Sequence, residues 1–440
     1  MKFLSLMTMS AAALALIGCH DQFGPTYTVS GTLTGLIGSG LVLADNSGDE
    51  FSPGANGGFV FGGGLGNGDA YSVTVATQPS NPAQTCTVRN GSGTIDKADV
   101  TNVIVSCTQT GRFAYVANQQ SNDISAYAID SANGQLFAID DSPFADGGTT
   151  PTALVVDPDG QFLYVANNGS NNVSVLSIDS STGELSLMGI PTPTGSAPGA
   201  VAIDPTDQYL FVANLASNNV SVFSINAGVL TEVADSPFAV GAEPASLAVD
   251  PNGNFLYVTN FNGANVGVFA IDLGTGTLSN ISGSPFAAAS GAISIAIDPT
   301  DAFAYIANEA AHSISEYSLN ASTGALTAVS GSPISAGSNV EFVAADPAGR
   351  YIYAANVSAV NQVASYSIAP ASGALTELST VAAGSLPICI VVDPSGQFIY
   401  AANYDSGDIS AYTVNASGAL VPVQGSPFAA GTEPHSIAID

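Results

Sequence analysis

From residue 112 onward, short apolar runs alternate with polar turns in a pattern that repeats seven times. The most regular run has six residues and ends in Asn, as in FAYVAN at 113–118 and FLYVAN at 162–167. The seven final Asn residues stand at positions 118, 167, 214, 260, 308, 356 and 403, at spacings of 46 to 49 residues. A repeat of this length is typical of one four-stranded blade of a β-propeller. The pattern therefore predicts a seven-bladed propeller over residues 112–440.

Each repeat unit predicts four strands. The first is an apolar run that ends in Asp-Pro, as at 200–205, and a tight turn joins it to the FLYVAN-type strand. A polar turn then leads to an alternating strand such as 220–225, and a Gly-containing turn leads to a fourth strand that often ends in Ser-Pro-Phe. Pro in this last segment suits an exposed outer edge, because the missing N–H costs little there.

The two ends of the repeat region complement each other. The first unit begins at Arg112 without an Asp-Pro strand of its own, whereas residues 434–440 form such a strand with no unit after it. We therefore expect residues 434–440 to complete the first blade as its innermost strand, beside residues 113–118. This closure would remove an open sheet edge that otherwise invites aggregation.

The N-terminal 18 residues have the features of an export signal. Lys2 supplies a positive charge, and residues 3–17 are apolar or small over a stretch too short for a comfortable membrane span. The following Cys19 completes a sequence, Leu-Ile-Gly-Cys, that resembles a bacterial lipobox, in which this Cys becomes the lipidated first residue. The resemblance implies an exported cell-envelope lipoprotein, at the outer membrane or cell surface, that contacts the membrane through its lipid alone. The alternative is an ordinary signal peptide with an incidental Cys.

Residues 26–108 follow the lipidated linker at 19–25 and carry a different pattern. Short alternating strands are expected near residues 27–33, 40–43, 58–61, 71–76 and 103–105, separated by turns rich in Gly and Asn. This pattern favours a small immunoglobulin-like β-sandwich. Cys86 and Cys107 are the only cysteines in this segment of an exported chain, so a disulfide between them is expected. The whole protein is therefore predicted to be all-β.

The charge balance excludes one class of partner. The chain has 35 Asp and Glu residues against five Lys and Arg residues, which gives a net charge of −30. Only Arg112 and Arg350 lie beyond residue 108. Nucleic-acid binding needs clustered cations that neutralise phosphates, so we expect no nucleic-acid partner.

The repeated strand, the Asp-Pro-x-Gly turn and the Ser-Pro-Phe segment resemble the seven-bladed lactonase-type propellers and the related YVTN repeat proteins. That group includes the bacterial 6-phosphogluconolactonase of the propeller kind. In these lactonases an Arg and a His follow the Pro at the start of an innermost strand, at the channel mouth. Here only His435 matches that pattern, and no Arg does. Because a phosphorylated lactone would meet carboxylates and no cation, we expect it not to be a substrate.

Residues that are unique to one blade are better site candidates than residues shared by all seven, which architecture explains. His435 starts an innermost strand and is the candidate general base toward a lactone carbonyl. Several further polar residues are expected on the same face, at strand starts or in connectors, as candidates for binding a ligand or cation: Glu433, Glu243, Glu341, His312, Glu309 and Asp405. An oxygen-rich set of this kind favours Ca²⁺. The alternative is that these side chains are solvated polar residues on loops.

Two functions follow from this pattern, and the sequence leaves open whether the protein is an enzyme. The first is a binding or interaction module at the cell envelope that takes a protein, glycan or cation ligand. The second is a lactonase-like hydrolase that acts on an unphosphorylated lactone at the channel mouth. Cys389 lies in an apolar strand without a neighbouring cation, so we expect a buried hydrophobic residue and not a nucleophile.

Overall fold

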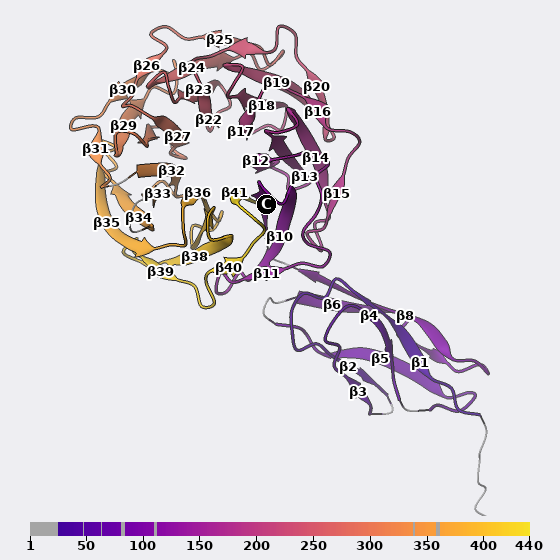
Figure 1. The fold of residues 1–440 in the computed structure, drawn as a ribbon. Helices are drawn as coiled ribbons and strands as arrows, with labels where there is room; N and C mark the ends of the chain where they lie inside the picture. The colour runs from indigo at the N-terminus through magenta and orange to yellow at the C-terminus, as the bar shows by residue number, and fades with distance from the viewer. Residues whose placement is uncertain are drawn as a thin grey trace, which may run out of the picture.

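The computed structural model describes residues 25–46, 48–62, 64–80, 84–109, 112–337, 339–357 and 361–440. The expected signal peptide and the lipidation site at Cys19 lie outside these residues and stay predictions. A ring of β-sheet blades and a smaller β-sheet unit beside it make up the molecule (Figure 1). The all-β fold and the seven-bladed propeller are confirmed. The described residues contain no helix that is long and apolar enough to cross a membrane.

The smaller unit consists of two four-stranded sheets that enclose one apolar core. The first sheet has the order β4 (Gly57–Val60), β1 (Val29–Thr34), β8 (Val100–Gln109) and β6 (Gln84–Arg89). The second has the order β3 (Glu50–Phe51), β2 (Val42–Asp45), β5 (Ala70–Thr77) and β7 (Ser92–Thr94). Inward-facing apolar residues such as Val29, Leu43 and Val105 are almost fully buried between the sheets, as the alternating pattern requires.

The predicted disulfide between Cys86 and Cys107 is present. The two residues lie directly opposite each other on the neighbouring strands β6 and β8 of one sheet. In immunoglobulin domains the corresponding bond joins the two sheets, and β1 and β8 here are also paired in parallel. The immunoglobulin-like part of the prediction is therefore not supported by these two features, although a two-sheet unit is present.

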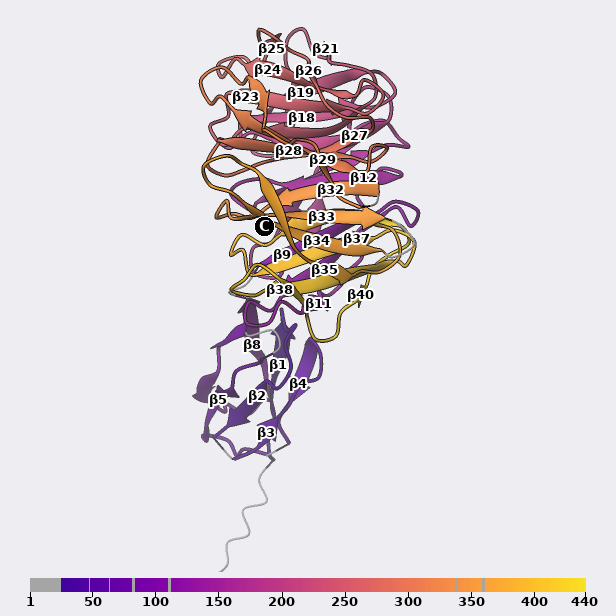
Figure 2. The same ribbon diagram turned by 90° about the vertical axis from the view of Figure 1, so that its left-hand side faces the viewer.

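The propeller is built from seven radial sheets around a central axis, and the view along its side shows them as a disc (Figure 2). The innermost strands, in the order of blades 1 to 7, are β41 (Pro434–Ile439), β12 (Pro151–Val156), β17 (Pro198–Ile203), β22 (Pro244–Val249), β27 (Ala292–Ile297), β32 (Asn339–Ala345) and β36 (Pro387–Val392). The second strands are β9 (Phe113–Asn118), β13 (Phe162–Asn167), β18 (Tyr209–Asn214), β23 (Phe255–Asn260), β28 (Phe303–Asn308), β33 (Tyr351–Val357) and β37 (Phe398–Asn403). The third strands are β10 (Asp123–Ile129), β14 (Asn172–Ile178), β19 (Asn219–Asn226), β24 (Asn265–Ile271), β29 (Ser313–Leu319), β34 (Gln362–Ile368) and β38 (Asp408–Val414).

The outer edge of most blades is broken into two short strands, which the sequence did not predict. The first pieces are β11 (Leu136–Ala138), β15 (Leu185–Leu187), β20 (Val229–Glu232), β25 (Leu278–Asn280), β30 (Leu326–Ala328) and β39 (Leu420–Pro422). The second pieces are β16 (Thr192–Pro193), β21 (Phe238–Ala239), β26 (Phe286–Ala287), β31 (Ile334–Ser335) and β40 (Phe428–Ala429). In blades 1, 3, 4, 5 and 7 a Ser hydroxyl beside the break accepts a hydrogen bond from the third strand, as Ser236 does from the Val222 N–H at 3.0 Å. Blade 2 is broken without such a Ser, and only in blade 6 does one outer strand, β35 (Leu375–Ala382), run unbroken among the described residues.

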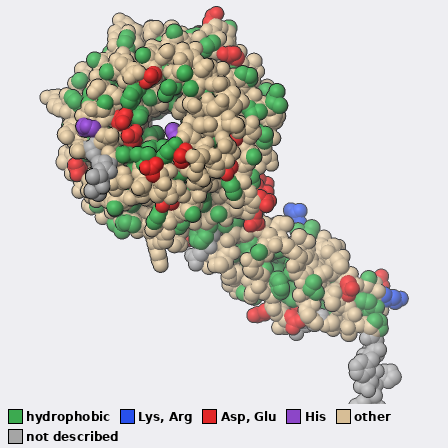
Figure 3. Space-filling model, in the orientation of Figure 1, with side chains coloured by type: hydrophobic (Ala, Val, Ile, Leu, Met, Phe, Trp, Pro, Cys, Tyr) green, Lys and Arg blue, Asp and Glu red, His purple; other side chains and the backbone are tan. Residues whose placement is uncertain are grey.

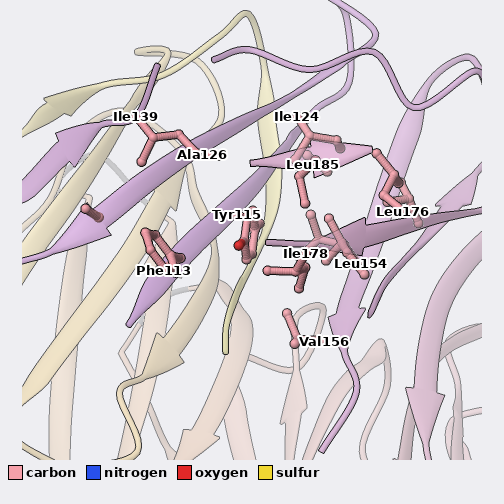
Figure 4. Close-up of a cluster of buried hydrophobic side chains, with 14 residues drawn as sticks. Phe113, Tyr115, Ile124, Ala126, Ile139, Leu154, Val156, Leu176, Ile178 and Leu185 are labelled. Atoms are coloured by element: carbon pink, nitrogen blue, oxygen red, sulfur yellow. The ribbon is translucent and has the colours of Figure 1, made fainter. Parts of the chain in front are cut away.

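Apolar side chains between adjacent blades form the core. Phe113, Tyr115 and Ile124 of blade 1 meet Leu154 and Leu176 of blade 2 in one such cluster (Figure 4). The Tyr115 hydroxyl also donates a hydrogen bond to the carbonyl oxygen of Gly183 in blade 2, at 3.2 Å. The FLYVAN-type strand therefore recurs because its side chains join each blade to its neighbour.

The ring closes as expected. Strand β41 pairs antiparallel with β9, so residues 434–439 form the innermost strand of blade 1. The Asp440 carboxylate accepts a hydrogen bond from the Phe113 N–H at 2.7 Å, and the Arg112 guanidinium donates to the Asp440 carbonyl oxygen. Each contact joins residues more than 320 positions apart.

Candidate functional site

A β-bulge lies near the start of every innermost strand. In β41, Pro434 pairs with Asn118 and Ser436 with Ala117, so His435 is the extra residue between them. The same shift occurs in all seven strands, and the extra residues in blades 1 to 7 are His435, Thr152, Gly199, Ala245, Ile293, Glu341 and Ile388. Bulges re-aim a side chain and are common beside functional sites. We refer to these seven residues as the bulge ring.

The bulge ring opens into a central cavity of about 550 Å³, which all seven innermost strands line. Below the ring, most of the lining side chains are aliphatic, such as Leu154, Leu247, Ile390 and Ile437. In the space-filling view the cavity is visible as an opening through the disc, with acidic and His side chains near it (Figure 3). Among the described residues no Lys or Arg lines this cavity.

His435 is held in one tautomer. Its Nδ1 lies 2.7 Å from the carbonyl oxygen of Thr152 in the neighbouring bulge. Because a carbonyl oxygen only accepts, Nδ1 carries the hydrogen and the Nε2 lone pair is left available. Burial lowers the pKa of His435, while the Thr152 carbonyl and Glu433 act in the opposite direction. The neutral imidazole is therefore the favoured form near pH 7, which is the form a general base requires.

Tyr404 and Glu433 support the imidazole from one side. The Tyr404 and His435 rings meet edge to face, with centroids 6.0 Å apart. The Tyr404 hydroxyl lies 2.7 Å from a Glu433 carboxylate oxygen and 2.6 Å from the Gln119 side-chain oxygen. Burial, followed by the hydrogen bond to Glu433, raises the pKa of Tyr404 to about 12. The Tyr404 hydroxyl is therefore neutral and can donate a hydrogen bond, which helps to position the Glu433 and Gln119 side chains.

Glu341 is the second ionisable residue of the bulge ring. Burial, together with the charge of Glu309 on the adjacent connector, raises the pKa of Glu341 to about 7. The side chain lines the central cavity. At neutral pH a large fraction of Glu341 thus keeps its proton and can donate it.

The two ionisable residues share one side of the ring, and small residues lie opposite. His435 on β41 and Glu341 on β32 are separated only by β36, whose bulge residue is Ile388. Across the ring lie Gly199 on β17 and Ala245 on β22. A Cβ atom at Gly199 would meet only the Leu215 side chain, at 3.9 Å, so this side of the mouth has free space. The mouth therefore combines room for a small molecule with two groups that can transfer protons.

The other sequence candidates lie farther from the bulge ring. Glu243 precedes β22 at the position that Glu433 occupies before β41, and its N–H donates to the Asn218 side chain at 2.8 Å. His312 is exposed in the connector before β29. Asp405 is exposed and lines a second hollow of about 410 Å³ beside Tyr404 and Glu433. The structure brings together His435 with Glu433, and Glu341 with Glu309, but not the whole set.

Two contributors, Thr152 and Gln119, were missed from the sequence, whereas Tyr404 was expected at this face, in the connector between the second and third strands of its blade. Thr152 contributes only a backbone carbonyl, so its residue type gave no signal. Gln119 and Tyr404 each follow the final Asn of a second strand and contact the start of β41. A comparison of that position across the seven repeats shows that Gln119 and Tyr404 are each unique to one blade.

The mouth offers no ready cation site. In the described part of the chain, no group of three or more His, Cys, Asp or Glu side chains is placed to hold a metal ion. The Ca²⁺ site expected among the mouth residues therefore has no matching donor set there. Cys389 lines the cavity wall but is buried, and burial raises the pKa of its thiol to about 11, so it is not an activated nucleophile.

Comparisons with known proteins agree with the fold. The sequence matches the family model described as "Lactonase, 7-bladed beta-propeller" over residues 82–197, 188–296, 234–337 and 304–437. A candidate 6-phosphogluconolactonase of Bacteroides uniformis is similar in structure, with TM-score 0.68, 22% identity, and 76% of this chain and 100% of that chain covered. The periplasmic gluconolactonase of Pseudomonas aeruginosa is also similar, with TM-score 0.65, 20% identity, and coverage of 74% and 98%. At these identities the structural likeness shows the fold alone. A search of curated proteins finds no match.

Proposed function

Because this chain belongs to the family of seven-bladed β-propeller lactonases, we propose that it hydrolyses an unphosphorylated lactone at the mouth of its central cavity. The observation that carries the proposal is the fixed tautomer of His435, which leaves Nε2 free in a cavity large enough for a small ligand. Pockets of about 300–1,000 Å³ are typical of small-molecule sites. With the expected lipid anchor, the activity would be located outside the cytoplasm.

The reaction follows from the two ionisable residues. Nε2 of His435 takes a proton from water, and the water oxygen forms a bond to the lactone carbonyl carbon. The tetrahedral intermediate then breaks the ring C–O bond, and the leaving oxygen takes a proton from the Glu341 carboxyl group. The new carboxylic acid releases its proton, which restores Glu341 through solvent, and the His435 imidazolium loses its proton to solvent. No charged cofactor is needed for this balance.

Charge sets the substrate class. A phosphorylated lactone would bring two negative charges close to the carboxylates of Glu309 and Glu433, and among the described residues no Lys or Arg lines the cavity. Arg350 is on the opposite face, where its guanidinium pairs with Asp346 at 3.0 Å. A neutral lactone avoids this repulsion, and one structural relative is named a gluconolactonase. The proposal is therefore restricted to uncharged lactones.

The experiment is a hydrolysis assay with the full-length protein on glucono-δ-lactone and on its 6-phosphate. We expect turnover of the neutral lactone well above the spontaneous rate and little or none of the phosphate ester. His435→Gln should lower kcat/KM by about 10²–10⁴-fold, as expected for loss of a general base. His312→Gln is the matched control, because it makes the same change at an exposed His on a connector.

The result also decides between catalysis and binding. Equal rates for the protein and the buffer, on this lactone and on simple δ-lactones, would contradict the proposal. The protein would then be better described as a binding module at the cell envelope with a protein or glycan ligand. Equal activity in His435→Gln and the wild type would keep the activity but remove His435 from it.

A further inference from the structure

The face opposite the mouth carries an asymmetry that lactone hydrolysis does not use. There, the innermost strands of blades 2 to 7 each end in an Asp-Pro turn, and the fourth turn residue has a positive φ of 56–73°. In blades 2, 4, 6 and 7 this residue is Gly, as expected for that conformation. In blades 3 and 5 it is Asp207 and Asp301.

In blades 6 and 7 the fourth turn residue lies against the Asp-Pro carboxylate of the preceding blade. A Cβ atom at Gly396 of blade 7 would lie 2.9 Å from Oδ1 of Asp346 in blade 6. At Gly349 of blade 6 it would lie 3.6 Å from Oδ2 of Asp298 in blade 5. An Asp at this position therefore points its carboxylate at the carboxylate of the blade before it.

Two such carboxylate pairs result. Asp207 of blade 3 lies near Asp157 of blade 2, and Asp301 of blade 5 lies near Asp250 of blade 4, because, after burial, the charge of the second residue in each pair also raises the pKa of the first. The Asn252 side chain of blade 4 donates to Oδ2 of Asp301 at 2.7 Å, which shows how closely the two turns approach. We call these the 157/207 pair and the 250/301 pair.

Each of the four carboxylates has a buried oxygen without a partner among the described residues. Asp157, Asp250 and Asp301 are only 4%, 0% and 7% exposed. In Asp157 and Asp250, Oδ1 accepts N–H groups of its own turn, and Oδ2 is the oxygen left over. The Tyr164 hydroxyl is a further unpartnered buried oxygen, and its pKa is raised by burial and by both Asp207 and Asp157.

The electrostatics of the pairs agree with this geometry. Burial, followed by the charges of neighbouring carboxylates, raises the pKa of Asp207 to about 6 and also raises the pKa of Asp301. Buried charges of one sign are unfavourable unless an opposite charge or a proton neutralises them. Because no Lys or Arg of the described residues forms an ion pair with either pair of carboxylates, a neutralising group must come from solvent.

We propose that each carboxylate pair binds one divalent cation of the Ca²⁺ type, so that two ions join blade 2 to blade 3 and blade 4 to blade 5. Hard oxygen donors favour Ca²⁺, and its six to eight ligands include water and carbonyl oxygens. Water is required here because the described residues hold no group of three or more acidic or His side chains placed for a metal ion. These sites lie at the other face from His435 and serve the fold, independently of any hydrolysis.

The chain itself supplies the variants that test this. Asp207→Gly and Asp301→Gly each recreate the Asp-Pro-x-Gly turn that four other blades contain, and Gly accepts the positive φ, so both should fold. Asp235→Gly is the matched control. Asp235 also has a positive φ, of 65°, but it is exposed on an outer turn.

The measurement is equilibrium dialysis of the full-length protein with ⁴⁵Ca²⁺, combined with Tm in CaCl₂ and in EDTA at neutral pH. We expect two ions per chain in the wild type and in Asp235→Gly. We expect one ion in Asp207→Gly and one in Asp301→Gly, and none in the double variant that carries both substitutions. Ca²⁺ should raise the Tm of the wild type and leave that of the double variant unchanged. In EDTA the double variant should melt at a higher temperature than the wild type, because the facing carboxylates are gone.

Two results would overturn the proposal. One is no Ca²⁺ binding by the wild type at millimolar concentration, and the other is unchanged stoichiometry in the double variant. A wild-type Tm that rises on acidification and does not respond to Ca²⁺ would show instead that each pair shares a proton.

Discussion

At one end of the innermost strands of blades 2 to 7 an Asp-Pro turn makes nearly the same contacts, whereas at the other end the bulge-ring residue varies from blade to blade and only Ile occurs twice. Asp204 represents the first kind, because its Oδ1 accepts the Gln208 and Tyr209 N–H groups at 2.7 and 2.6 Å. His435 represents the second kind, since no other blade has a His there. Residues that recur in the same position of most blades therefore maintain the fold, and candidate catalytic residues occur at positions where the blades differ.

The largest effect is expected from breaking the repeated end. Asp204→Ala removes the acceptor for two backbone N–H groups at a site only 1% exposed, which should cost about 2–3 kcal/mol of unfolding free energy. Lactone hydrolysis at a permissive temperature should hardly change. Chemical denaturation together with kcat/KM checks both expectations.

Asp204→Asn is the control for this variant, because Asn keeps Oδ1 as an acceptor. Its loss of stability should be clearly smaller than that of Asp204→Ala. If the alanine variant kept its stability but lost its activity, the division between the two ends would be wrong.

A smaller effect is expected from filling the open side of the mouth. Gly199→Phe adds a ring where a Cβ atom would meet only Leu215, so the fold should be retained. The ring occupies space opposite His435 and Glu341, and kcat/KM should fall about tenfold, equivalent to about 1.4 kcal/mol, mainly through KM. Gly54→Phe, on an exposed loop of the smaller unit with no neighbour within 4 Å, is the matched control. Unchanged KM in Gly199→Phe would show that substrate does not enter from this side.

The smallest effect is expected at Arg350. Its guanidinium pairs with the buried Asp346 but is itself 55% exposed, and exposed ion pairs contribute about 0–1 kcal/mol. Arg350→Gln should therefore lower Tm by at most a few degrees and leave hydrolysis unchanged, as differential scanning calorimetry and the lactone assay would report. A large loss of activity would indicate a cation requirement that the mouth does not show.

The sequence was sufficient to predict the ring because every blade repeats the same interactions. The spacing of the FLYVAN-type strands and the Asp-Pro turns predicted the blades. The strand at 434–440 predicted how the ring closes, and β41 pairs with β9 as expected. The broken outer edge was not predictable in this way, because the Ser hydroxyls beside most of the breaks act through contacts with the third strand. The parallel pairing of β1 and β8 likewise depends on contacts far apart in sequence.

The candidate site was predictable only in part. The position of His435 and Glu341 at strand starts pointed to both residues. The bulges that turn them toward the cavity cannot be recognised from the residue types. The tautomer of His435 depends on the carbonyl of Thr152, 283 residues away. The raised pKa of Glu341 depends on burial and on Glu309 of the preceding blade. Contacts between blades therefore determine the chemistry, and a single repeat cannot show them.

The most direct test of the central claim is the dependence of kcat/KM on pH for glucono-δ-lactone, corrected for spontaneous hydrolysis, in the wild type and in Glu341→Gln. His435 must be neutral to act as the base. Burial lowers its pKa despite the nearby Glu433, so activity should fall only when the pH drops below the ordinary pKa of a His side chain. Glu341 must be protonated, so activity should fall again as the pH rises through about 7. We predict a bell-shaped profile in the wild type and loss of the alkaline limb in Glu341→Gln. The same profile in both proteins, or no catalysed hydrolysis at any pH, would contradict the account.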